Sequence, residues 1–108
     1  MRDIILAVTH ALQIKLPFKI IIRQHIKGAS ALYYEMHRKG KLVSHRIEIA
    51  LAWEDIRDTE TLLVHELIHA WQAENGFTDT HGKSFQRKAK ELETLLGIKN
   101  LYIPGADI

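Results

Sequence analysis

Two histidines and a glutamate interrupt an apolar stretch of the chain, LLVHELIHAWQ at residues 62–72. On a helix, His65 and His69 lie on one face, about 6 Å apart along the axis, so their imidazole nitrogens can bind a single cation. Glu66 is rotated by about 100° from His65, which places it beside the cation rather than on it. There its carboxylate can accept a proton from water activated by a metal. The H-E-x-x-H spacing therefore predicts a zinc site with Glu66 as the general base.

The alternative is a pair of core histidines that satisfy their hydrogen bonds within the protein. The metal site is favoured because the helix is apolar around most of its circumference, where unpaired polar side chains are costly. Zinc that does chemistry binds three protein ligands and leaves one position open. His81 is the candidate third ligand, since it follows a short loop and the adjacent Gly82 permits a close backbone approach. The remaining histidines have no helpful spacing and are expected to be ordinary surface or partly buried residues: His10, His25, His37 and His45.

The composition is that of one soluble globular domain over residues 1–108. Apolar residues make up 46% of the chain and charged residues 26%, and no apolar run approaches the roughly 20 residues of a membrane span. We therefore expect no membrane association. The absence of cysteine excludes a disulfide framework and a cysteine-ligated zinc ribbon within this chain, so any metal must be held by histidine and carboxylate. It also suits a reducing compartment, and we expect a cytoplasmic location.

Hydrophobic periodicity predicts an α+β fold in the order helix, three strands, helix, helix. The N-terminal helix is expected over residues 2–15 and stops before Pro17. Lys39-Gly40 is expected to turn a hairpin, and we expect the strands to form an antiparallel meander over three ranges: 18–27, 31–38 and 42–51.

The last two helices are expected to carry the site. Asp58 is a suitable N-cap for the active-site helix, and Gly76 a suitable residue to end it. A second, ligand-bearing helix is expected to begin near His81 and to stop at Gly97.

The spacing of these motifs resembles the SprT-like metallopeptidase family, including the Spartan-type proteases. The family pattern is H-E-x-x-H followed by a loop and H-G-x-x-F, and the likeness is strongest over residues 59–98. The matching positions are His65, Glu66, His69, His81, Gly82 and Phe85. The resemblance implies a minimal zincin-like metalloprotease domain, zinc bound by the three histidines and Glu66-assisted hydrolysis of peptide bonds. In the best-known members it also implies proteolysis of proteins crosslinked to DNA, and hence a nucleoid-associated or, in a eukaryote, nuclear location.

Zinc peptidases of this helix type commonly bind their substrate as an added β-strand on a sheet edge. Residues 44–51, SHRIEIAL, are expected to be that edge. Backbone pairing of this kind gives little sequence selectivity. Three histidines suit zinc, although manganese, cobalt or nickel could also occupy such a site in vitro.

The charge distribution does not decide whether the protein binds DNA. Residues 19–46 carry seven basic side chains against Glu35 alone, which suits contact with a polyanion such as DNA or, equally, a set of solvated strand faces. Tyr33, Tyr34 and Trp53 suit either stacking on unpaired bases or core packing. The sequence therefore leaves three candidates: a zinc endopeptidase acting on DNA-bound proteins, a non-catalytic DNA-binding module, and a regulatory zinc peptidase acting on a specific partner without DNA. It does not indicate the oligomeric state.

Overall fold

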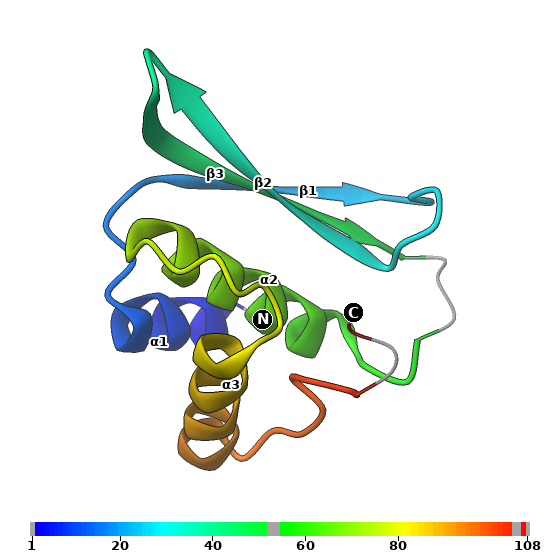
Figure 1. Cartoon of the computed structure of the whole chain (residues 1–108). Helices are drawn as coiled ribbons and strands as arrows, with labels where there is room; N and C mark the ends of the chain where they lie inside the picture. Colours follow the sequence, from blue (N-terminus) through cyan, green and yellow to red (C-terminus); the bar gives the residue numbers. More distant parts are fainter. Residues whose placement is uncertain (1, 52–54, 105–106, 108) are drawn as a thin grey trace.

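The fold, taken from a computed structural model, is described here for residues 2–51, 55–104 and 107. Three helices lie on one side of a three-stranded sheet (Figure 1). The elements follow in the expected order: α1 (Arg2–Leu12), β1 (Phe18–Arg23), β2 (Ala31–Arg38), β3 (Lys41–Ala50), α2 (Thr59–Glu74) and α3 (Lys83–Leu96). The α+β class is confirmed. None of the helices in these residues is long and apolar enough to cross a membrane.

The sheet is mixed, with strand order β1-β3-β2. β2 and β3 form the expected antiparallel hairpin, whose two-residue turn places Lys39 and Gly40 at φ values of 52° and 76°. β1 instead pairs parallel to β3, with Ile20 opposite Ile47. The predicted all-antiparallel meander is therefore wrong for one of its two pairings. Residues 24–30 carry the chain past β3, so β1 and β2 lie on opposite sides of it.

The central position of β3 also corrects the expected substrate edge. Residues 44–50 of the predicted edge lie inside the middle strand, whose backbone hydrogen-bonds to neighbours on both sides. The centre suits this strand because Ile47 and Ile49 are fully buried between the sheet and the helices. The edges of the sheet are β1 and β2.

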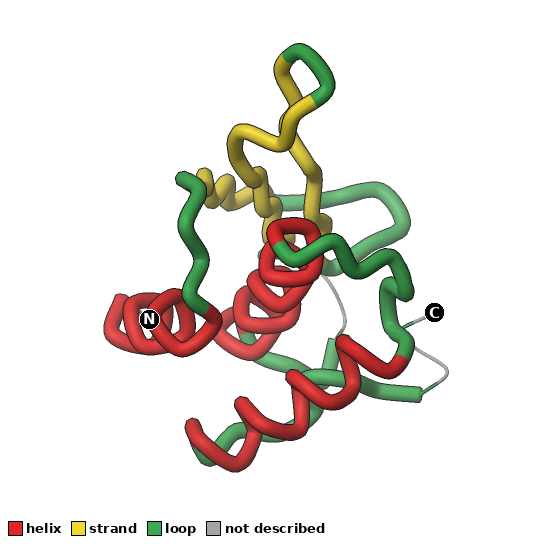
Figure 2. Tube along the Cα trace, turned by 60° about the vertical axis from the view of Figure 1, so that its left-hand side comes forward, coloured by secondary structure: helices red, strands yellow, loops and turns green. Residues whose placement is uncertain are grey.

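Helix α2 occupies the centre of the molecule, between the sheet on one side and α1 and α3 on the other (Figure 2). This explains why apolar residues surround it: Leu63, Leu67 and Ile68 are all fully buried. As predicted, Asp58 caps its start by accepting a hydrogen bond from the Thr61 N–H (2.8 Å), and Gly76, at φ 76°, follows its end. The helix that carries His65 and His69 is thus capped at its start and buried against the sheet and both other helices.

Candidate metal centre

The structure brings the three predicted histidine ligands together. His65 and His69 project from one face of α2. His81 was expected on the second helix, but α3 begins only at Lys83, so His81 approaches them from the loop before it. The His81 Nε2 atom lies 3.2 Å from the Nε2 atoms of both His65 and His69. Nitrogen atoms that bind one tetrahedral zinc at 2.0–2.1 Å are separated by about 3.3–3.4 Å. The three histidines therefore have the spacing of a metal-binding triad.

Hydrogen bonds behind the first two imidazoles determine which nitrogen faces the centre. The His65 Nδ1–H donates to the Leu101 carbonyl oxygen at 2.6 Å, an atom that can only accept. The His69 Nδ1–H donates to Gln72 Oε1 at 2.8 Å, because the Gln72 amide nitrogen is itself a donor to the Thr80 carbonyl at 2.8 Å. Both Nε2 atoms consequently present a lone pair to the shared centre, which is the tautomer that a metal requires.

Gln72 also fixes the loop that delivers the third ligand. Its amide donates to the Thr80 carbonyl and to Ser84 Oγ, on either side of His81. Asp79 in turn accepts from the N–H of Ser84, in the first turn of α3, at 2.7 Å. A Cβ added at Gly82 would lie 2.9 Å from Asp79, so this tight loop needs a glycine there, as the sequence predicted.

Burial sets the electrostatics of the centre. It lowers the pKa of both His65 and His69 to about 4, with repulsion between the histidines adding to the shift. Burial likewise raises the pKa of Glu66 to about 8, helped by the nearby Asp107 carboxylate. The Glu66 carboxylate lies 3.8 Å from His65 Nε2. It stands beside the three nitrogens and outside the triad, as the helical spacing predicted.

The triad lines a cleft of about 830 Å³ between the sheet and α2. One wall is formed by residues 28–33, which include the start of the edge strand β2. Ile103 and Asp107, from the end of the chain, line it as well. The edge strand beside the centre is therefore β2, in place of the predicted residues 44–51.

A buried polar cluster beside the cleft was missed. His45, expected to be an ordinary histidine, is 1% exposed and contacts Glu74 (Nε2 to Oε2, 2.6 Å) and Tyr33 (Nδ1 to the hydroxyl, 2.7 Å). The Tyr33 ring stacks on that of His69, with centroids 6.1 Å apart. A sequence signal did exist, because His45 shares the inward alternation of Ile47 and Ile49.

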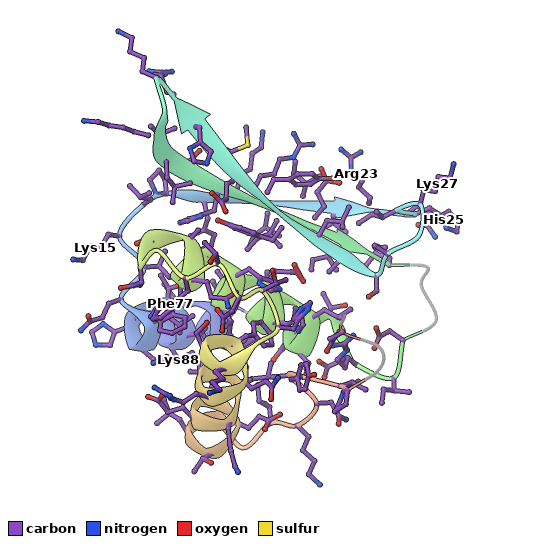
Figure 3. All side chains as sticks on the ribbon, viewed as in Figure 1. Lys15, Arg23, His25, Lys27, Phe77 and Lys88 are labelled. Carbon is purple, nitrogen blue, oxygen red and sulfur yellow. The ribbon has the colours of Figure 1, made fainter. Side chains whose placement is uncertain are left out.

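Glu74 holds this cluster to the loop after α1. Its carboxylate accepts backbone hydrogen bonds from Lys15 (2.8 Å) and Leu16 (3.0 Å), while the Lys15 side chain points away from the fold (Figure 3). Burial alone would raise the pKa of Glu74, but the hydrogen bonds from His45 and the two amides outweigh it, so the pKa lies below its ordinary value.

Replacing Glu74 with alanine should destabilise the protein by about 3 kcal/mol or more, because it leaves His45 and two backbone amides without their acceptor. Urea unfolding of Glu74→Ala measures this. Glu91→Ala is the matched control, since its pairing with Lys88 is largely exposed, and it should cost no more than about 1 kcal/mol. Equal losses in the two variants would contradict a structural role for the cluster.

The shifted pKa values predict how the stability of the metal-free protein depends on pH. The unfolded chain binds the His65 and His69 protons more tightly, so stability falls as the pH drops from 6.5 towards 4. Glu66 acts in the opposite sense, because the folded state holds its proton more tightly, and stability falls as the pH rises from 4.5 towards 8. Between these limits the two histidines outweigh the single glutamate until the pH reaches the ordinary histidine pKa, so the maximum lies at about pH 6.5.

Urea midpoints of chelator-treated protein across this pH range test the expectation. The variant Glu66→Gln should lose the decline on the alkaline side and keep the one on the acid side. If the stability of Glu66→Gln fell at alkaline pH as much as that of the wild type, the alkaline loss of stability would have to come from a group other than Glu66.

Three of the seven basic residues in the range 19–46 lie on the sheet face opposite the helices, namely Lys19, Arg23 and Arg46. Lys19, Arg46 and Tyr34 lie in one row across the strands, with the Arg46 guanidinium 5.7 Å from the Tyr34 ring centre. Figure 3 shows Arg23 on this outer side and His25 and Lys27 at the far end of the β1–β2 connection. Trp53 lies outside the described residues. Of the proposed stacking residues, Tyr34 is thus on the basic face, and Tyr33 lies at the cleft.

Comparison with known proteins gives no assignment. No family model, no curated protein and no solved structure matches this chain. The resemblance to SprT-like metallopeptidases therefore rests on the residues that carry it.

Proposed function

We propose that this protein is a zinc-dependent endopeptidase in which His65, His69 and His81 hold the metal and Glu66 is the general base. The observation that carries the proposal is the convergence of three histidines, with His81 Nε2 lying 3.2 Å from the Nε2 atoms of the other two, beside a buried carboxylate in a cleft. A purely structural site has no use for this carboxylate and is usually closed by a fourth protein ligand.

The residues would divide the chemistry between them. Bound zinc supplies Lewis acidity, which activates water and polarises a carbonyl group. Glu66 takes the proton of the attacking water and delivers it to the departing amine. Its raised pKa, about 8 without metal, reflects a low-dielectric position in which the carboxylate readily holds such a proton.

The edge strand β2 is the proposed binding surface for the substrate backbone. Its inner edge pairs with β3, and among the described strands none pairs with its outer edge. The first residues of β2 line the cleft that contains the triad. A peptide added there as a further strand would place its backbone along the metal centre, with little demand on its sequence.

DNA-bound or DNA-crosslinked proteins are the proposed substrates. Support comes from the family resemblance and from the basic sheet face with Lys19, Arg46 and Tyr34, which suits phosphate contacts and base stacking. This function would place the protein at the nucleoid, or in the nucleus of a eukaryote. A regulatory peptidase without DNA is the second candidate, because Arg23 and Arg46 already pair with Glu48 and offer less free charge.

The test of the proposal is cleavage of a basic DNA-binding protein. Zinc-loaded enzyme and chelator-treated enzyme are compared, each in the presence and in the absence of single-stranded DNA. We expect cleavage by the zinc-loaded enzyme, stronger with DNA and falling steeply with salt. Cleavage indifferent to DNA would favour the regulatory peptidase. Zinc and DNA binding without cleavage would favour the third candidate, a DNA-binding module that cuts nothing.

A further inference from the structure

The carbonyl behind His65 comes from a segment far along the chain. Leu101 is fully buried, and its carbonyl oxygen accepts the His65 Nδ1–H although 36 residues separate the two. Its own N–H donates to Glu93 Oε2 on α3 at 3.0 Å. The orientation of one proposed metal ligand therefore depends on how residues 101–104 and Asp107, here called the C-terminal segment, lie against α2.

One arginine clamps this segment in place. The Arg57 side chain is only 6% exposed, and its Nη1 donates to Asp107 Oδ2 at 2.9 Å. Asp107 in turn makes two hydrogen bonds with Ile103: its Oδ2 accepts from the Ile103 N–H at 2.7 Å, and its own backbone N–H donates to the Ile103 carbonyl at 2.9 Å. The link thus runs from Arg57 through Asp107 to the residues that follow Leu101.

The same arginine reaches the opposite wall of the cleft. Its Nε and Nη2 atoms donate to the two oxygens of Asp55 at 3.0 and 3.1 Å, and Asp55 accepts from the Ser30 hydroxyl at 3.1 Å. Ser30 immediately precedes β2 and lines the cleft. Arg57 therefore connects the start of the proposed substrate edge with the segment that orients His65.

A buried ion network is a poor source of stability, since apolar side chains of similar volume often do as well. It does fix geometry, because the planar guanidinium and its two carboxylates tolerate few arrangements. We propose that Arg57 is a positioning residue of the metal centre, which docks the C-terminal segment through Asp107 so that the Leu101 carbonyl sets the tautomer and plane of His65. This inference rests on the proposed metal binding.

Zinc affinity of the folded protein, measured by competition with a chromophoric chelator, is the test. Removing an outer partner of a metal-bound histidine typically costs about 10–100-fold in affinity. Asp107→Ala leaves the Leu101 carbonyl in the chain but releases the segment that holds it, so it should weaken zinc binding by about tenfold, the lower end of that range. Asp107→Asn keeps an acceptor oxygen and should lose less. Glu91→Ala, on the exposed face of α3, is the control and should match the wild type.

The absorption spectrum of the cobalt-substituted protein provides a second readout, which a merely structural role would leave unchanged. We expect a shifted ligand-field spectrum in Asp107→Ala and none in Glu91→Ala. A folded Asp107→Ala protein with wild-type zinc affinity and a wild-type cobalt spectrum would overturn the inference. If the alanine variant does not fold, wild-type zinc affinity and a wild-type cobalt spectrum in Asp107→Asn would overturn it instead. Wild-type protein that binds no metal would instead overturn the proposed function itself.

Discussion

Replacing Glu66 with glutamine is expected to lower peptide-bond cleavage by the zinc-loaded protein about 10²–10⁴-fold while leaving zinc bound. Glutamine has nearly the same shape, but its amide cannot accept the proton of the attacking water. The metal should remain because the three histidine nitrogens converge without Glu66. Comparing kcat/KM with the zinc content of the same preparation measures both halves of the expectation.

The control for this variant is Glu91→Gln, an equivalent change on the exposed face of α3, which should leave cleavage unaltered. If Glu66→Gln kept cleavage within about tenfold of the wild type, a contribution as large as a general base supplies would have to come from another residue. If it lost zinc as well as activity, Glu66 would belong to the metal-binding set.

Replacing His81 with alanine is expected to abolish zinc binding at stoichiometric concentrations. The outer partner of a metal-bound histidine is worth about 10–100-fold in affinity, and a direct ligand is worth more than its partner. His81 comes from a loop and is not one of the fully buried core residues, so the fold should survive its loss. Equilibrium dialysis against zinc, with circular dichroism to confirm folding, provides the measurement.

His37→Ala is the matched histidine control, because His37 is exposed and contacts only Glu35 among its described hydrogen bonds. It should bind zinc like the wild type. Retention of one zinc by the His81→Ala protein would show that two histidines of α2 suffice, or that another group supplies the third position.

Local sequence signals predicted that the three histidines would lie close together, and the structure brings them together. The spacing of His65, Glu66 and His69 fixes their relation on any helix, and the short loop before His81 leaves little freedom in where that residue can lie. The capping role of Asp58 and the turn at Gly40 follow from the same kind of short-range chemistry and are confirmed.

The features that the sequence did not reveal depend on long-range contacts. The run of isoleucines in β1 predicts a strand but cannot say which strand lies beside it, and the neighbour turned out to be β3, in parallel. The partners of the ligands are similarly remote, as the 36 residues between His65 and Leu101 illustrate. Nothing in the local pattern around Arg57 predicts that it meets Asp107, 50 residues further on.

The central position of β3 also implies an order of events during folding. The β2–β3 hairpin closes around two residues and can form alone within about 1–10 μs, whereas β1 joins β3 across the 27 positions from Ile20 to Ile47 and must close a longer loop. We expect β1 to add to an existing hairpin. Substituting Gly40, whose φ of 76° the turn requires, should therefore mainly slow folding, while Ile20→Val should mainly speed unfolding.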